Sequence, residues 1–180
     1  MNPLSNKENV DNFRSSRNEY MLKSPESPIP SNVREKFTEL PFFPFNENFR
    51  VSIELIQRSK PKETDVVGLN GNTKTVSKVG KAEFQVPGTS EKLSLEVYKD
   101  REQGFMFTIF GDLTNNTNET YGAGRYVKIE QETDGEMYID FNTAISPYCS
   151  YSEKFPCPLT PRKNRLNVRI DAGEKYIGEH

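Results

Sequence analysis

From Phe49 onward, apolar residues recur at every second position in a series of short runs. A period of two places such residues on one face of a β-strand. Turn signals separate the runs: LNGN near 70, PGTS at 87–90, TNNTN at 114–118 and TDGE at 133–136. The pattern predicts an all-β domain, a mostly antiparallel barrel or sandwich of about eight strands. The alternating runs are 49–55, 82–86, 93–97, 137–141 and 166–170, with FMFTIF at 105–110 apolar on both faces.

The first 45 residues follow a different pattern. Residues 1–8 are expected to be a disordered tail, and residues 9–23 a weakly amphipathic helix that ends before SPESPIP. The prolines favour an extended arm, which ends in PFFPF at 41–45. We therefore expect a helix and Pro-rich arm over 9–45, packed on a β-domain over 46–180.

Charge and hydropathy narrow the class of protein. The net charge is -2 over 180 residues, so neither nucleic acid nor an anionic membrane is an expected partner. No apolar run approaches the length of a membrane span, and the N-terminus has no apolar signal region. We expect a cytoplasmic protein.

Few residues are suited to catalysis or metal binding. The single histidine is His180, the last residue, which argues against His-dependent nucleophilic catalysis and His-rich metal sites. Cys149 and Cys157 lie eight residues apart in a proline-rich stretch. They are expected to be a paired or buried thiol pair, and the alternative is a reactive thiol at Cys149. No metal site is predicted, and no cofactor is indicated.

Arg125 is the most unusual candidate for a binding site. It shares strand parity with the apolar Val127 and Ile129, so its guanidinium is expected to point inward. A buried arginine needs a carboxylate, and Glu174 has the parity to supply it. Two interpretations stay open: Arg125 binds a carboxylate or phosphate ligand, or it forms an internal ion pair that fixes strand register.

Other polar residues flank Arg125 in the C-terminal third. Asp112 either caps the Asn-rich turn or lies at the rim of a binding site. The YIDFN segment presents a polar face that is either solvated or the wall of a pocket covered by the loop 146–161. Together with Arg125 and Glu174, the candidate ligand-binding residues are Tyr121, Asp112, Asp140, Asn142 and Tyr151.

Several of these segments carry a family resemblance. The motifs FGDLTN, ETYGAGRY, DFN, the proline-cysteine stretch, NRL at 164–166 and AGEKY at 172–176 occur in order. They resemble a bacterial and archaeal family known as domain of unknown function 1684. The resemblance runs from about PFFPFNENFRV to the C-terminus, and the chain looks like a short, single-domain member. Ala123, Tyr148 and Thr160 depart from the family's usual residues. Because the family has no established activity, the resemblance implies a fold unit alone.

Function is therefore an expectation drawn from residue types. The leading hypothesis is a small β-domain that binds a small anionic molecule around Arg125. One alternative is a histidine-free enzyme that uses Asp140 or Glu174, buried and raised in pKa, as general acid or base. The other is a protein-interaction module that docks through its N-terminal arm.

Overall fold

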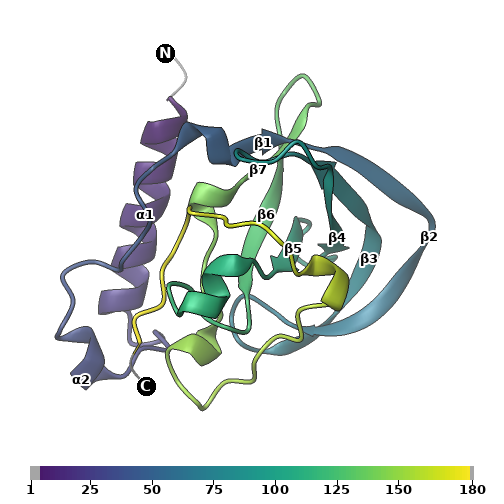
Figure 1. Ribbon diagram of the computed structural model, residues 1–180. Coiled ribbons are helices and arrows are strands. Elements are labelled where there is room, and N and C mark those ends of the chain that lie inside the picture. Colours follow the sequence, from purple (N-terminus) through teal and green to yellow (C-terminus); the bar gives the residue numbers. More distant parts are fainter. Residues whose placement is uncertain (1–4, 179–180) are drawn as a thin grey trace.

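A computed structural model describes residues 5–178 as one antiparallel sheet, an N-terminal helix and a long C-terminal segment (Figure 1). The helices are α1 (Asn6–Lys23) and α2 (Ser31–Arg34). The strands are β1 (Arg50–Ser52), β2 (Glu54–Val67), β3 (Thr73–Phe84), β4 (Leu93–Lys99), β5 (Met106–Phe110), β6 (Arg125–Gln131) and β7 (Met137–Asp140). Short 3₁₀ turns include η2 (Leu113–Thr117), η3 (Phe141–Thr143), η4 (Tyr148–Ser150) and η5 (Arg162–Asn164).

The seven strands form one sheet in the order β1-β7-β6-β5-β4-β3-β2. The two end strands, β1 and β2, are consecutive in the chain and only Ile53 separates them. The sheet must therefore curl strongly, because one continuous stretch of chain contributes both of its ends. The predicted antiparallel β-domain with an N-terminal helix is confirmed. A closed barrel or a two-sheet sandwich is not, since the strands form a single sheet that does not close into a barrel.

The hairpin of β2 and β3 is the part that the alternation did not predict. Both strands are long, yet β2 is exposed along most of its length and carries charged residues where apolar ones would alternate. Its pairing with β3 is interrupted by a register shift between Gln57 and Lys62. Irregular pairing of this kind bends a strand and increases its twist. In Figure 1 the two strands arch away from the rest of the molecule.

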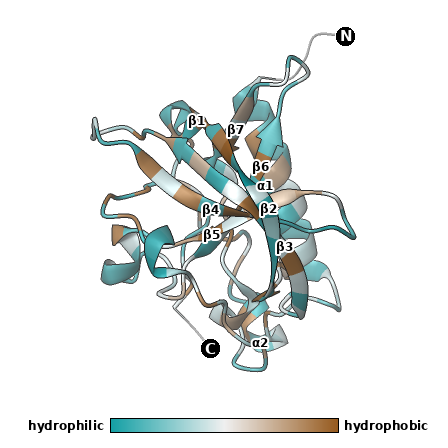
Figure 2. Cartoon of the chain, turned by 90° about the vertical axis from the view of Figure 1, so that its right-hand side faces the viewer, coloured by the Kyte–Doolittle hydropathy of each residue, from teal (hydrophilic) through white to brown (hydrophobic). Residues whose placement is uncertain are grey.

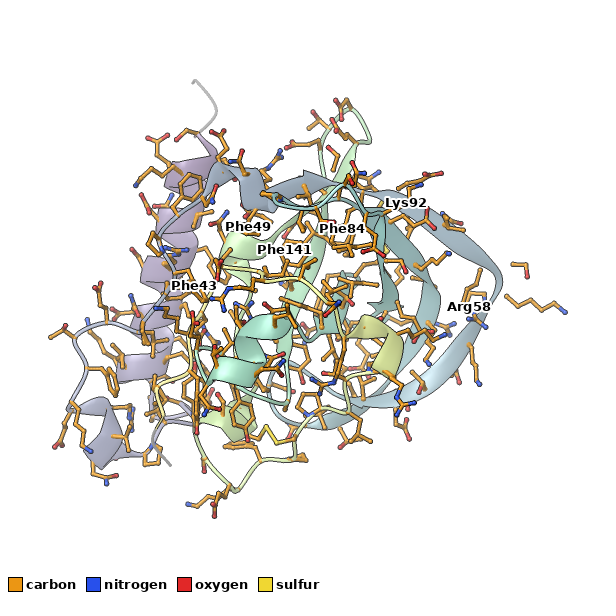
Figure 3. All side chains as sticks on the ribbon, in the orientation of Figure 1. Phe43, Phe49, Arg58, Phe84, Lys92 and Phe141 are labelled. Carbon is orange, nitrogen blue, oxygen red and sulfur yellow. A yellow bond between two sulfur atoms is a disulfide. The ribbon has the colours of Figure 1, made fainter. Side chains whose placement is uncertain are left out.

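The main core lies against the face of the sheet on which the alternating residues gather, and hydrophilic and hydrophobic segments alternate along the strands (Figure 2). Aromatic rings fill its centre: the Phe84 and Phe141 ring centroids are 5.6 Å apart, and those of Phe110 and Phe141 are 5.2 Å apart. Figure 3 shows Phe49, Phe84 and Phe141 in the interior. Members of this core come from both the strands and the C-terminal segment, and include Val51, Leu95, Val127, Ile139, Leu166 and Ile170.

The C-terminal segment is extended but is not a strand of the sheet, which corrects the prediction for 166–170. It runs beside the chain that follows β5: Leu166 N–H donates to the Gly111 carbonyl at 2.8 Å, and Leu113 N–H donates to the Val168 carbonyl at 3.0 Å. Alternation predicted its buried face correctly, because any extended chain has period two whether or not it joins a ladder. The segment differs from the predicted strand only in its hydrogen-bond partners.

Helix α1 packs across one side of the sheet domain. It begins at Asn6 with a capping box formed by Ser5 and Glu8, so it takes in part of the stretch 1–8 that was expected to be disordered; residues 1–4 lie outside the described part. Its buried Met21 joins a second cluster with the arm and the loop after β7, made of Ile29, Val33, Leu40, Tyr148 and Tyr151. The arm is thus folded onto the domain.

Candidate functional site

Arg125 is fully buried at the start of β6. Its guanidinium donates to the backbone carbonyls of Ile170 at 3.0 Å, Ala172, and Glu174 at 3.4 Å. These carbonyls belong to alternate residues of the extended C-terminal segment, so they face the same way. Burial lowers the pKa of Arg125 and the Asp112 carboxylate opposes that shift; arginine keeps its proton in such surroundings. Most N–H groups of the Arg125 guanidinium therefore donate to acceptors within the protein itself.

The carboxylate beside Arg125 is Asp112, at 3.4 Å, and not the side chain of Glu174. Asp112 also accepts the Ile170 N–H at 2.7 Å and caps η2, where Thr114 donates to it. The capping interpretation is correct, and the same carboxylate serves as the partner of the buried arginine. Parity missed this pair because Asp112 lies in a turn, where side chains follow no period of two.

Glu174 forms a second buried ion pair, with Arg17 of α1. The Arg17 Nε lies 2.9 Å from its carboxylate, and the Glu174 side chain is fully buried while that of Arg17 is 11% exposed. Burial raises the pKa of Glu174 above its usual value, and the positive charge of Arg17 only partly opposes this. The pair connects the helix to the C-terminal segment. A carboxylate enclosed in this way has no surface to offer a substrate.

Asp140 and Asn142 hold the N-terminal arm in place. Asp140 caps η3 by accepting from the Asn142 N–H at 3.0 Å. The Asn142 side chain then bonds both backbone groups of Asn46, at 3.0 Å and 2.8 Å. The polar face of YIDFN is therefore neither solvated nor a pocket wall, because the arm covers it and uses its hydrogen bonds.

Cys149 and Cys157 form a disulfide, with Cα atoms 5.3 Å apart. The Tyr121 hydroxyl lies 3.6 Å from the Cys157 sulfur, and the Tyr121 ring packs at a tilt against that of Tyr176, with centroids 5.1 Å apart. Tyr151 is buried in the cluster beneath α1. The predicted thiol pair is thus bonded, and a free reactive thiol at Cys149 is excluded in this state.

The residues predicted from the sequence therefore divide among separate contacts. One group secures the C-terminal segment, another the helix, and a third the arm. Within residues 5–178 no group of three or more His, Cys, Asp or Glu side chains is placed to hold a metal ion. None of the helices in the described part of the chain is long and apolar enough to cross a membrane.

A cavity of about 230 Å³ lies elsewhere, between β2, β3, β4 and η5. Beside the cavity β4 separates from β5, since those two strands pair only at Tyr98 and Lys99. Asn164 of η5 bridges the separated strands: it accepts the Glu96 N–H at 2.8 Å and donates to the Ile109 carbonyl at 2.9 Å. The cavity is lined by Ile56, Gln57, Arg58, Gly80, Lys81, Ser94, Glu96, Lys163 and Asn164.

The charge of this cavity is mostly positive. Arg58, Lys81 and Lys163 line it together with a single carboxylate, Glu96. Lys163 approaches Glu96 at 3.0 Å and Lys78 approaches it at 3.5 Å. Burial by itself raises the pKa of Glu96, but the hydrogen bonds and charges of these lysines outweigh it and leave the pKa lowered. Glu96 is therefore ionised at neutral pH and offsets one of the cations.

Sequence reasoning did not find these cavity residues. They come from segments far apart in the chain, and each alone resembles an ordinary surface charge. One local signal was present: the run RSKPK at 58–62 breaks the alternation with cations and a proline. Such a run indicates an irregular edge strand. The positions of Lys81 and Lys163 beside it follow from the folded chain alone.

Comparison with known proteins identifies relatives without assigning an activity. A solution NMR structure of an uncharacterised protein from Haloarcula marismortui superposes with a TM-score of 0.77 at 29% identity, and the match covers 97% of this chain and 96% of that one. Comparison with curated proteins finds no match. The sequence profile of the family described as "Protein of unknown function (DUF1684)" matches residues 35–175, which include β1 to β7 and the Arg125 network. The chain therefore belongs to the DUF1684 family, as a single-domain member.

Proposed function

We propose that the protein binds a small anionic molecule, bearing a carboxylate or phosphate group, in the cavity between β2, β3, β4 and η5. The ligand class is the one that the sequence suggested, but the cations differ. The observation that carries the proposal is the gathering of Arg58, Lys81 and Lys163 around a cavity with one carboxylate. A concave site with a few converging polar groups is the usual form of a small-molecule site.

Arg58 is the cation best placed to act as the anchor. Its one hydrogen bond within residues 5–178 is a long one, from Nε to the Lys60 carbonyl at 3.5 Å, and it forms no ion pair there. Most donors of its planar fork are therefore available for bidentate contact with a carboxylate or phosphate. Figure 3 shows Arg58 at the outer bend of β2, on the side away from α1. Arg125 differs, because its guanidinium already donates hydrogen bonds to backbone carbonyls.

Lys81 and Lys163 supply further positive charge. Lys81 lies 3.1 Å from Glu83, and Lys163 lies 3.0 Å from Glu96. Both lysines are at least half exposed, so these ion pairs are weak and an incoming anion competes with them. Electrostatic attraction of this kind weakens with salt. Binding should therefore be strongest at low ionic strength.

The backbone of β4 offers polar groups as well. The Glu96 N–H points away from β3 because it donates to Asn164. Ser94 precedes it by two residues in an unbroken register, so its N–H and carbonyl point the same way. Ser94 also lines the cavity. A ligand with a polar group near its anion gains a hydrogen bond at this position.

A thermal-shift experiment tests the proposal. Inorganic phosphate, pyrophosphate and succinate are added at constant ionic strength, with sodium chloride as the reference. A ligand that binds the native state raises the melting temperature by mass action. Wild type should gain stability from at least one probe, and Arg58→Ala combined with Lys81→Ala should lose that gain.

Lys60→Ala is the matched control, because Lys60 is an exposed cation of the same strand that does not line the cavity. It should keep the full shift. The proposal fails if no probe stabilises wild type beyond the chloride reference. It also fails if Lys60→Ala loses as much of the rise in melting temperature as the double variant does. The effect would then come from the net charge of the protein and not from the cavity.

The enzyme hypothesis has less support. Glu174 has the raised pKa that a general base needs, but it is fully buried and paired with Arg17. Asp140 is engaged with η3. The interaction hypothesis also loses its proposed surface, because the arm is held by its own domain: Phe43 N–H donates to the Gly173 carbonyl at 2.9 Å. Anion binding is therefore the function we favour.

A further inference from the structure

The disulfide joins two cysteines in very different surroundings. Cys149 is 3% exposed, in η4, whereas Cys157 lies at the surface. We propose that this disulfide is a thiol–disulfide exchange site, at which an external thiol attacks the Cys157 sulfur and frees the loop between the two cysteines. The site is separate from the anion cavity and does not depend on it.

Exposure decides which sulfur reacts. Exchange requires a thiolate to reach one sulfur along the S–S bond, and only Cys157 is at the surface. The new bond forms between the external sulfur and Cys157, and the electron pair of the broken bond leaves on Cys149, which then takes a proton. A second thiol of the reductant attacks the mixed disulfide and releases Cys157 as a thiol. The protein gains two electrons and two protons, and a dithiol reductant becomes a disulfide.

The contact with Tyr121 assists the second step, in which Cys157 is released from the mixed disulfide. Its hydroxyl lies 3.6 Å from the Cys157 sulfur, close enough for a weak hydrogen bond with sulfur. A donor at that position stabilises the thiolate of Cys157 when it leaves the mixed disulfide. Cys149 leaves in the first step because it is buried, and the external thiolate reaches only Cys157.

Opening the disulfide should release only a short stretch of chain. Neither cysteine belongs to the main core. On the N-terminal side, Ile145 and Tyr126 form a β-bridge. On the C-terminal side, the Thr160 hydroxyl donates to the Ala123 carbonyl at 2.6 Å. These contacts do not need the disulfide, so the freed segment is confined to the chain between them, residues 146–159.

The loop covers a junction of three parts of the molecule. The Phe155 ring packs edge-on against Tyr148, with centroids 5.2 Å apart. Gly71, in the turn between β2 and β3, lies so close that a Cβ there would come within 2.6 Å of the Phe155 ring. Tyr148 also belongs to the cluster beneath α1. Reduction therefore loosens the contact between the hairpin turn and the loop.

The anion cavity should remain unchanged on reduction. Its residues Lys163 and Asn164 follow the disulfide in the chain, but Asn164 is fixed by its bonds to Glu96 and Ile109. The Thr160 contact lies between Cys157 and η5. Loss of the anion-dependent thermal shift and loss of exchange are thus separate results.

Trypsin reports on the loop directly, because Lys154 lies between the two cysteines and is exposed. The folded wild-type protein is treated with dithiothreitol, and cleavage after Lys154 is timed on reducing gels. We expect the reduced protein to be cut about tenfold faster or more, because cleavage follows the population of open loop. Reoxidation should restore the slow rate, and cleavage after Lys92 serves as the reference.

Two single variants identify the attacked sulfur. Cys149→Ser leaves the exposed Cys157 thiol, which should react with iodoacetamide rapidly, and with oxidised glutathione to give a mixed disulfide. Cys157→Ser leaves the buried Cys149 thiol, which should react at least about tenfold more slowly. Equal rates would overturn the assignment of Cys157. Reduction that occurs only in denaturant, or that leaves cleavage after Lys154 unchanged, would show a purely structural disulfide.

Discussion

Two cationic regions of this molecule differ in what their charges bind. Arg125 is fully buried, and its donors reach three backbone carbonyls and Asp112. Arg58 lies at the outer bend of β2 and makes one long hydrogen bond to the backbone. Desolvation explains the contrast, because a buried guanidinium is stable only when the protein itself supplies acceptors. The inward-pointing arginine is therefore a structural residue, and the exposed one is available to a ligand.

The largest expected effect is at Arg125. Arg125→Met should lower the free energy of unfolding by about 3–5 kcal/mol, because Asp112 is left buried without its cation. Urea unfolding followed by circular dichroism measures it. Arg169→Met is the control, since Arg169 is an exposed arginine of the same C-terminal segment, and it should cost under about 1 kcal/mol.

If Arg125→Met yields no folded protein, Arg125→Lys keeps the charge but loses the fork. It should fold with an intermediate loss of stability. A cost for Arg125→Met no greater than that for Arg169→Met would mean that the buried network does not secure the C-terminal segment.

Asn164 connects the two kinds of region, since it is a buried residue that positions the cavity. Asn164→Ala removes its bonds to Glu96 and Ile109, and should cost about 2 kcal/mol. It should also weaken the anion-dependent thermal shift, because Lys163 loses its fixed neighbour. Asn167→Ala, at an exposed position of the same segment, should change neither quantity. Equal effects at both positions would contradict the bridging role.

The Arg17–Glu174 pair gives a pH-dependent prediction. Because burial raises the pKa of Glu174 above its ordinary value of 4.5, the folded protein holds this proton more tightly than the unfolded chain. Its contribution to stability is present below that value and is lost as the pH rises through the folded pKa. The stability of wild type relative to Glu174→Gln should therefore fall as the pH rises.

Urea unfolding of both proteins, at about pH 4 and about pH 7, measures this difference; each unit of raised pKa corresponds to about 1.4 kcal/mol. A relative stability that rises with pH would show that the attraction of Arg17 outweighs the cost of burying the Glu174 carboxylate.

The smallest effect on stability is expected at Arg58. Arg58→Ala should change the free energy of unfolding by less than about 0.5 kcal/mol, because an exposed side chain that forms no ion pair with any of residues 5–178 contributes little. The same substitution should reduce the anion-dependent thermal shift. A large loss of stability without any anion would show that Arg58 supports the fold of β2, and the contrast with Arg125 would then disappear.

Strand parity correctly predicted that the Arg125 side chain points inward. It did not identify Asp112 as the carboxylate that pairs with it. Arg125, Val127 and Ile129 are all buried, as the period of two requires. The strand begins only at Arg125, since residues 121–124 form a turn in which the Gly124 N–H donates to the Tyr121 carbonyl at 2.9 Å. Gly124 adopts a φ of 100° in that turn, a conformation that other residues rarely take.

The β2–β3 hairpin and the cavity beside it were beyond sequence reasoning. Lys62 and Lys78 face each other across the two strands, and such a like-charge pair gives no signal for a strand. These strands form because a long ladder of backbone hydrogen bonds and the buried residues of β3 outweigh the poor local pattern of β2. The sheet must curl for Arg58, Lys81 and Lys163 to come together. The degree of curl cannot be predicted from any short stretch of the sequence.

The sequence by itself determined which residues face inward, because alternation of apolar and polar side chains depends only on the extended backbone. It also determined the family and the proximity of the two cysteines. Only the tertiary structure decided the partners: Asp112 for Arg125, Arg17 for Glu174, and an open cavity for Arg58. The reason is physical, since burial is a property of one position along a strand. A partner or a cavity depends on where distant segments meet.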